Sequence, residues 1–423
     1  MSTLWQRLRK RAPPGEEGLF FTVLDVGTTF VKALVCQVRD EGARVVGVGR
    51  ERQGAGAMQA GAIADIAAVM QTSDQALRQA EDMTERILGQ KAVPDQAVLG
   101  IAGNLVKGVA CTVRVQRPKP TERITAGELA TVVERVERLA LNQVREEMAW
   151  ERRAPAVEIR LVNAAIVGVE IDGYRVVNPL RFQGGSLAVT AFNAFAPLVH
   201  VGALRTVATE LGLEPLAIIA EPFAVARALT PGEAIFIDVG GGTTDLALAR
   251  RGIEGTRSFA LGGQTFTGRI ASALGLSPER AEETKLAYAR RRLDAELSER
   301  LRQAIAGEKQ TWLDSVELLL EELAAGEPLP ARLCLCGGGS GLPDIVEGLR
   351  SFPWLRRLPF PRYPEIGLIQ PRDVTGIQDS THQLLSPQDV TPLALAAQAL
   401  RQQERPLGLL DLALDRALRA MKV

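Results

Sequence analysis

Residues 234–245 of the chain read Ala234-Ile235-Phe236-Ile237-Asp238-Val239-Gly240-Gly241-Gly242-Thr243-Thr244-Asp245. An apolar run therefore leads into an acidic residue, three glycines and two threonines. Three consecutive glycines disfavour helix and strand alike, because glycine loses the most backbone entropy on ordering, so such a run suits a place where backbone must approach a ligand closely. The pattern predicts a buried strand followed by a loop that can hold phosphate oxygens through backbone N–H and hydroxyl groups.

The same design occurs earlier in the chain. Phe20–Asp25 is predicted as a strand, Gly27 and the pair Thr28-Thr29 as a turn, and Val31–Val38 as a second strand. Taken alone, this motif equally suits an ordinary hairpin. Two copies on related lobes can face each other and clamp one triphosphate between them. We expect the aspartates that end the two strands to hold Mg²⁺ through water.

A third glycine loop follows the apolar run Leu333–Cys336 and reads Gly337-Gly338-Gly339-Ser340-Gly341-Leu342-Pro343. It has neither the glycine order of a Rossmann turn nor the Lys-Ser/Thr ending of a P-loop. A planar base can lie on such a flat glycine surface. Cys334 and Cys336 read as small buried residues, because no second cysteine pair or histidine cluster accompanies them.

These residues resemble the superfamily of actin, heat-shock chaperone and sugar-kinase ATPases. Asp25–Thr29 resembles its phosphate-1 loop, Asp238–Thr243 its phosphate-2 loop and Gly337–Pro343 its adenosine loop. Glu221-Pro222-Phe223-Ala224 resembles the connecting helix whose first residue helps position the attacking water. Glu282-Glu283-Thr284-Lys285 resembles the segment that holds ribose and base. The resemblance implies an α/β actin-like ATPase fold with two related lobes around a nucleotide cleft.

ATP and Mg²⁺ are the cofactors that this resemblance implies. Glu221 and Asp238 are assigned to catalysis, and Asp25 and Asp238 to the metal ion. Whether ATP is hydrolysed at a useful rate is left open, because tight binding without turnover requires the same residues. The residues assigned to nucleotide binding are Gly27, Thr28, Thr29, Gly240, Gly241, Gly242, Thr243, Glu282, Lys285, Gly337, Gly338, Gly339 and Ser340.

Within the superfamily the chain most resembles the FtsA family of bacterial cell-division proteins. Strings typical of that family are Gly61–Ile66, Val98–Gly103, Val177–Gly184 and Gly262–Thr267. The resemblance implies a small inserted α+β subdomain. The PilM family of type IV pilus assembly proteins shares the insert and the loops and is the alternative. In place of the strand-rich small subdomain of FtsA, the segment after Lys285 predicts two helices separated near Gly307.

The helical and strand patterns give a domain plan in which two discontinuous lobes surround the insert. Strands are also expected at Ala97–Ala102 and, with a turn at Asp172-Gly173, within Val157–Val189. Helices are expected at Ile63–Ile87, Ala126–Glu147, Val199–Leu213, Pro222–Leu229, Pro278–Ala306, Trp312–Ala324 and Thr391–Gln403. The expected domains are a basic N-terminal segment (1–17), lobe I (18–103 and 191–230, closed by a helix at 386–403), the α+β insert (104–190), lobe II (231–385, with a reduced helical subdomain at about 276–330) and an amphipathic tail (404–423).

The two ends are candidate membrane contacts. Trp5 lies beside Arg7, Arg9, Lys10 and Arg11, and Gly408–Val423 forms an amphipathic pattern. FtsA proteins end in a membrane helix, so the resemblance implies a cytoplasmic protein held peripherally on the inner face of the cell membrane. A packed or disordered end explains the tail equally well. No apolar run is long enough to span a bilayer, and no h-region follows the basic N-terminal residues.

Composition limits the partners. The 423 residues contain 50 Lys and Arg against 50 Asp and Glu, so no chain-wide basic excess favours nucleic acid. Four scattered cysteines indicate a reducing compartment. The resemblance implies self-association and either an FtsZ-like division filament or a short peptide of a pilus membrane protein as partner. A sugar or acetate kinase would need an acceptor-side base, for which no motif is found.

Overall fold

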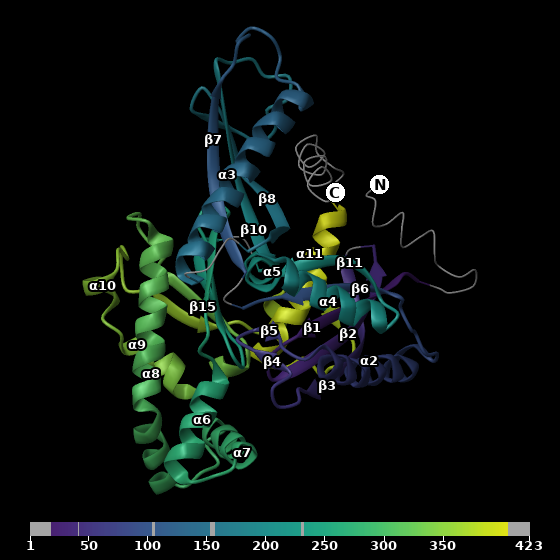
Figure 1. Ribbon diagram of the computed structural model, residues 1–423, viewed down its shortest axis with the longest axis vertical. Coiled ribbons are helices and arrows are strands. Elements are labelled where there is room, and N and C mark those ends of the chain that lie inside the picture. Colours follow the sequence, from purple (N-terminus) through teal and green to yellow (C-terminus); the bar gives the residue numbers. More distant parts are fainter. Residues whose placement is uncertain (1–17, 41, 104–105, 153–156, 230–231, 405–423) are drawn as a thin grey trace.

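The computed structural model describes residues 18–40, 42–103, 106–152, 157–229 and 232–404, which form two lobes and a projecting insert (Figure 1). The strands are β1 (Phe20–Val26), β2 (Phe30–Arg39), β3 (Gly42–Arg52), β4 (Met58–Gln59), β5 (Ala62–Ile63), β6 (Gln96–Ile101), β7 (Lys107–Gln116), β8 (Ile159–Ile171), β9 (Tyr174–Val176), β10 (Ser186–Pro197), β11 (Glu214–Ala220), β12 (Ala234–Val239), β13 (Thr244–Ala249), β14 (Ile253–Phe259), β15 (Arg332–Cys336), β16 (Glu365–Leu368) and β17 (Ile377–Asp379). The helices are α2 (Ile66–Leu88), α3 (Ala126–Arg152), α4 (Leu198–Glu210), α5 (Glu221–Ala228), α6 (Gly263–Leu274), α7 (Pro278–Ala289), α8 (Ala295–Ala324), α9 (Pro343–Ser351), α10 (Trp354–Arg357) and α11 (Val390–Glu404), with 3₁₀ turns η1 (Gly338–Gly341), η2 (Pro371–Asp373) and η3 (Pro387–Asp389).

Lobe I is built on a mixed six-stranded sheet in the order β11-β6-β1-β2-β3-β17. β1 pairs antiparallel with β2 and parallel with β6. Helix α2 packs very closely on β2 and β3. A Cβ at Gly47 would overlap the Ala80 carbonyl of this helix, and a Cβ at Gly49 would overlap the Ala76 carbonyl. Glycine on β3 therefore sets how closely this helix packs on the sheet.

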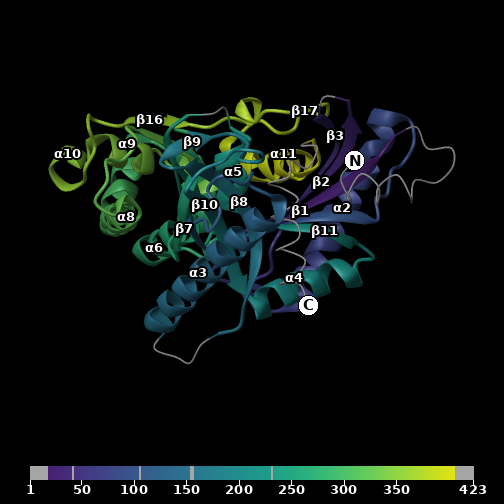
Figure 2. The same ribbon diagram turned by 90° about the horizontal axis from the view of Figure 1, so that it is seen from above.

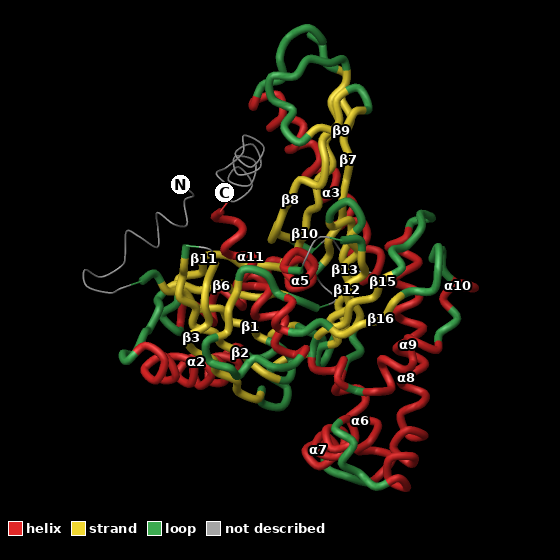
Figure 3. Tube along the Cα trace, turned by 180° about the vertical axis from the view of Figure 1, so that it is seen from behind, coloured by secondary structure: helices red, strands yellow, loops and turns green. Residues whose placement is uncertain are grey.

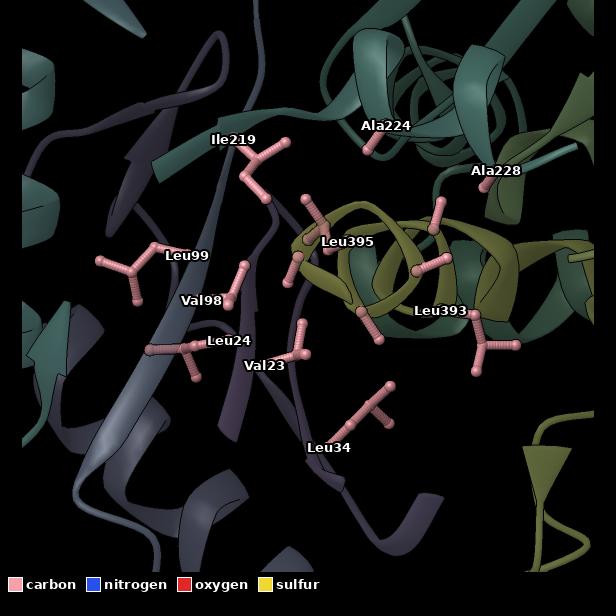
Figure 4. Close-up of a cluster of buried hydrophobic side chains, with 14 of the residues drawn as sticks. Val23, Leu24, Leu34, Val98, Leu99, Ile219, Ala224, Ala228, Leu393 and Leu395 are labelled. Atoms are coloured by element: carbon pink, nitrogen blue, oxygen red, sulfur yellow. The ribbon is translucent and has the colours of Figure 1, made fainter. Parts of the chain in front are cut away.

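The opposite face of this sheet is covered by α11 and α5. Figure 4 shows Leu395 of α11 lying between the sheet residues Val23 and Val98 and the helix α5. Leu395 is fully buried, as are Val23 and Val98. Because α11 begins beside lobe II and packs along lobe I, it contacts the interior of both lobes.

A nine-stranded sheet joins lobe II to the insert, in the order β16-β15-β12-β13-β14-β7-β10-β8-β9. The join is short: β14 meets β7 at the pairs Gly255–Val109 and Thr256–Gly108. Beyond it, α3 packs against β7 and β10, and the insert rises away from both lobes (Figures 1 and 3). The insert is thus connected to lobe I through the chain and to lobe II through backbone hydrogen bonds.

The hairpin expected at Asp172-Gly173 is confirmed. Both residues have positive φ, 49° and 85°, as a two-residue turn between antiparallel strands requires. Asp172 also accepts hydrogen bonds from the N–H groups of Gly185 and Ser186, at 3.0 and 2.6 Å. These bonds hold the tip of the insert in place.

One predicted break is wrong. The helix interrupted near Gly307 is the continuous helix α8, and the real break lies at Arg290–Asp294, where Arg291 has φ 55°. Asp294 caps α8 by accepting the Leu297 N–H at 2.8 Å. A helical glycine costs only about 1 kcal/mol, and the buried residues Ile305 and Trp312 on either side outweigh it. Within the described residues, no helix is long and apolar enough to cross a membrane.

Candidate nucleotide site

The two glycine-threonine loops face each other across the boundary of the lobes. Each is a tight turn with its own hydrogen bond, from the Gly27 N–H to the Phe30 carbonyl at 3.1 Å and from the Gly240 N–H to the Thr243 carbonyl at 2.9 Å. A side chain at Gly241 would overlap Thr29. A Cβ on Gly242 would likewise come within 2.8 Å of Thr28 Cγ2. The backbone of Gly241 and Gly242 is therefore packed directly against Thr28 and Thr29.

The third glycine loop lies against the end of β12. Gly337 has φ 83°, and a Cβ there would overlap the Asp238 carboxylate, so only glycine fits. A Cβ on Gly339 would lie 2.5 Å from Val239 Cγ1. The buried Ser340 hydroxyl donates to the Gly337 carbonyl at 2.7 Å. Ser340 thus stabilises the turn itself, whereas Gly338 and Gly341 are the open positions of this loop, with no atom closer than 3.8 Å to an added Cβ.

Lys32 of β2 was not singled out from the sequence, and it lies in the middle of the acidic residues. Its Nζ is 3.0 Å from Asp25 Oδ2. Burial opposes the charge of Lys32, but the carboxylates of Asp25 and Asp238 outweigh that effect and raise its pKa. A lysine at the third position of the largely apolar strand β2 was the available signal, because a buried ammonium needs a partner.

Lys32 interacts with the carboxylates of Asp25, Asp238 and Glu221, and Asp245 acts in turn on Asp238 and Glu221. Burial and the neighbouring charges of Asp25, Asp238 and Asp245 raise the pKa of Glu221 well above its ordinary value. Burial likewise raises the pKa of Asp238 to about 6, although a 2.5 Å hydrogen bond from Thr391 Oγ1 opposes the shift. The excess of acid over base favours a bound divalent cation.

Two residues from distant segments help to position Glu221 and Asp238: Gly100 of β6 and Thr391 of α11. A Cβ on Gly100 would lie 2.7 Å from Glu221 Oε1, so the Glu221 side chain occupies the space that this glycine leaves. Thr391 is the second residue of α11. Neither Gly100 nor Thr391 was singled out as a site residue, since each acts only through a segment distant in sequence.

Asp245 was also missed as a site residue, although it ends the quoted motif. It accepts hydrogen bonds from the Gly103 N–H at 3.2 Å, from Thr243 Oγ1 at 3.0 Å and from Ser258 Oγ at 2.5 Å. Gly103 precedes the insert, whereas Thr243 and Ser258 belong to lobe II. Asp245 therefore connects the phosphate-2 loop to lobe I.

Glu282 and Lys285 lie one turn apart on α7 and form an ion pair at 2.7 Å. Lys285 also donates to the Gly263 carbonyl at 2.9 Å and to Thr267 Oγ1 at 2.8 Å. Burial lowers the pKa of Lys285. The Gly263 N–H in turn donates to the Gly240 carbonyl at 2.9 Å, so the start of α6 links this pair to the phosphate-2 loop.

The structure thus brings together all the segments from which the sequence predicts a site. Asp25 and Asp238 contribute carboxylate oxygens from matching strand ends. Among the described residues there is no cluster of three or more His, Cys, Asp or Glu ligands that would enclose a metal ion directly. All four cysteines are buried and unbridged. A hydrated ion contacted by two carboxylates is the arrangement that these donors fit.

Comparison with known proteins gives a consistent relation. A family model described as "Cell division protein FtsA" matches residues 235–379. FtsA of Bacillus subtilis (strain 168) is 26% identical over 385 residues, which cover 84% of this chain and 82% of the relative. The chain is similar in sequence to the cell division protein FtsA over most of its length. FtsA of Pseudomonas aeruginosa is 27% identical over 368 residues, with 78% and 80% covered.

The chain also has a structural neighbour among pilus proteins. A solved structure described as "PilM-PilN type IV pilus biogenesis complex" matches with a TM-score of 0.60 at 20% identity, covering 90% of this chain and 98% of the other. This likeness concerns the fold alone. The fold is that of the actin-like ATPases, as the sequence predicts.

Proposed function

We propose that this chain is an ATP-binding actin-like scaffold of bacterial cell division, which links an FtsZ-like partner filament to the inner face of the cytoplasmic membrane. The observation that carries the nucleotide part is the close approach of the two glycine-threonine loops beside four carboxylates. The relation to FtsA supports the division role.

The residues present fit ATP and Mg²⁺. The glycines at 241 and 242 allow the second loop to approach Thr28 and Thr29 closely, because any Cβ would overlap these threonines, and the threonines supply hydroxyl donors beside the glycine backbone. Asp25 and Asp238 would hold the hydrated ion, which neutralises phosphate charge when bound. Gly337 to Ser340 and the pair Glu282 and Lys285 would hold the base and ribose. Lys32 balances part of the acidic charge from inside β2.

Glu221 is the residue proposed to orient and deprotonate the attacking water. Its pKa is raised, so the deprotonated form that acts as a base becomes more populated as pH rises. If hydrolysis occurs, its rate should increase with pH until Glu221 is fully ionised. Glu221→Gln should slow hydrolysis and leave ATP affinity nearly unchanged, whereas lost affinity with normal turnover per bound nucleotide would reverse the roles.

The deciding experiment for nucleotide binding is calorimetric titration of the full chain with ATP, with and without Mg²⁺. Asp25→Ala should reduce the Mg²⁺ dependence of binding. Asp74, which is partly exposed on α2, provides the matched control, since Asp74→Ala removes a carboxylate that pairs with Arg78 of the same helix. Failure of the intact protein to bind ATP would contradict the proposal.

The membrane part rests on the two ends, 1–17 and 405–423, which lie outside the described residues. Co-sedimentation with anionic liposomes that falls at high salt is the expected result, because single amphipathic segments bind weakly and partly through charge. Deleting residues 408–423 should reduce binding more than neutralising Arg7, Arg9, Lys10 and Arg11. Equal sedimentation of the deleted and intact proteins would argue against a C-terminal anchor.

A PilM-like adaptor that binds a short peptide of a membrane partner is the second candidate. The observation that favours it is the all-helical segment α7–α8 after Lys285, where FtsA is expected to carry a strand-rich subdomain. Titration with an FtsZ-type C-terminal peptide and with the cytoplasmic peptide of a pilus membrane protein distinguishes the two. Binding of the pilus peptide alone would favour the adaptor.

A further inference from the structure

The segment from Arg350 to Asp373 carries positive charge that the structure does not neutralise. It contains five arginines and only two acidic residues, Glu365 and Asp373. Arg357 pairs with Glu317 at 2.5 Å. The others are exposed, and in the part of the chain that the structure describes they have no acidic partner; they are Arg350, Arg356, Arg362 and Arg372.

A buried aromatic cluster holds this segment in one conformation. The Trp354 indole N–H donates to the Leu349 carbonyl at 2.7 Å, and its ring lies 4.5 Å from that of Phe352 and 5.8 Å from that of Phe360. The Tyr363 hydroxyl donates to the Phe352 carbonyl at 3.0 Å, while the ring stays partly exposed. The arginines are therefore presented by an ordered surface.

The same segment forms an open edge of the nine-stranded sheet. β16 pairs only with β15 among the described strands. The Glu365 N–H donates to the carbonyl of Ala331, directly before β15, at 3.0 Å, and the Ile369 N–H donates to the Leu335 carbonyl of β15 at 2.8 Å. Because backbone groups alternate along a strand, those of Ile366 and Leu368 point away from the sheet. Figure 2 shows β16 along the rim of lobe II, on the side of α9 and α10.

We infer that the β16 edge binds an extended acidic segment of a partner protein by strand addition. The outward backbone groups of β16 would pair with the partner backbone, and the arginines would meet its carboxylates. Exposed Leu368 would contact an apolar side chain of the partner. An anionic lipid surface would meet the arginines but leave the strand edge unpaired, and Glu365 would oppose any acidic ligand.

The test uses the full chain without nucleotide, so that its outcome is independent of ATP binding. The probe is a fluorescent synthetic peptide with alternating glutamate and valine. The double variant R350E/R362E should weaken binding by at least about tenfold, whereas E365Q should strengthen it. The matched control R86E/R205E reverses two exposed arginines of α2 and α4 in lobe I and should leave binding unchanged.

Strand addition is tested separately with a peptide that alternates glutamate and proline, which cannot form the ladder. Equal affinity for the two peptides would overturn strand addition, and equal affinity of R350E/R362E and the unmodified protein would overturn the whole inference. Retained thermal midpoints show that the variants fold. Binding to phosphatidylserine vesicles through these arginines without peptide binding, or self-association lost in R350E/R362E, would also overturn it in favour of a lipid or a second copy.

Discussion

At the scale of single residues, Gly241 shows how little space the candidate site leaves. A Cβ at this position meets Thr29 across the lobe boundary before it meets any ligand. We expect Gly241→Val to abolish the thermal stabilisation that MgATP gives, with the fold retained, because the loop is exposed to the other lobe and not to a core. Differential scanning fluorimetry with and without MgATP measures this.

The matched control is Gly268→Ala on α6, where a Cβ has no neighbour within 4 Å. This variant should keep the full nucleotide response. Undiminished stabilisation of the Gly241→Val protein would contradict the assignment of this loop to phosphate.

Glu137 is a buried residue that should make the stability of the protein depend on pH. It is fully buried on α3, and neither carboxylate oxygen has a hydrogen-bond partner among the described residues. Burial, with a smaller contribution from Glu134, raises its pKa to about 7. Since the folded state holds this proton more tightly than the unfolded state, Glu137 makes stability fall as pH rises from about 4.5 to about 7.

Glu137→Leu should therefore raise the unfolding free energy by about 3 kcal/mol at pH 8 and change it little at pH 4. Urea unfolding at a series of pH values measures the difference. Glu146→Leu, an exposed position of the same helix, should not alter the pH dependence. If the pH dependence of the unfolding free energy were the same in Glu137→Leu and the unmodified protein, the Glu137 carboxyl would not have a raised pKa in the folded state.

At the scale of elements, glycines on α8 and β3 distinguish the effect of helix propensity from the effect of close packing. Gly307 lies in the middle of this helix with open space around it, so Gly307→Ala should stabilise the protein by about 1 kcal/mol. Gly49→Ala on β3 should instead destabilise it by about 2 kcal/mol, because the methyl group would overlap the α2 backbone. Thermal unfolding of the two variants gives the comparison. Destabilisation by Gly307→Ala would mean that α8 bends there.

The elements also show what sequence reasoning can reach. The strands that end in Asp25 and Asp238 are predicted because apolar runs stop at glycine, and both are confirmed. β3 was missed, since Gly42, Gly47 and Gly49 interrupt its apolar pattern, yet those glycines are there to admit α2. A short stretch of sequence is enough to predict a glycine loop after an apolar strand. It does not show that a glycine in a strand makes room for a helix far away in the sequence.

The residues of the candidate site also fall into two groups, those that sequence motifs predict and those that only the fold reveals. The glycine loops and their aspartates follow from motifs, and the structure brings them together. Lys32, Thr391 and Asp245 act through partners far away in sequence, so only the folded chain reveals them. The join between β14 and β7 was equally hidden, because two ladder pairs leave no periodic pattern.

At the scale of the whole molecule, the insert reaches the site through α5. Asn163 of β8 accepts the Ala220 N–H at 2.7 Å, directly before Glu221, and Phe192 of β10 stacks on Phe223 at 5.4 Å. We expect MgATP to slow amide hydrogen exchange in the loop between β12 and β13 and also in β8 and β10. Asn163→Ala should keep the first effect and reduce the second, since it removes one of the two contacts.

Hydrogen exchange followed by mass spectrometry resolves these segments. Thr112→Ala, which removes an exposed hydroxyl pair with Thr190 on the same sheet, should leave both effects in place. Protection of β8 and β10 by MgATP in Asn163→Ala at the level of the unmodified protein would show that the insert senses the site by another route.

Helix α11 gives the molecule a path for mechanical load. Thr391 in its first turn donates a hydrogen bond to Asp238, its middle is buried between the lobe I sheet and α5, and near its end Arg401 donates to Thr375 Oγ1 at 2.6 Å. The chain beyond Glu404 continues directly from this helix. We therefore expect tension applied to the chain after Glu404 to be transmitted through α11 to Asp238 at the lobe boundary, which would couple the tail to the conformation of the two loops.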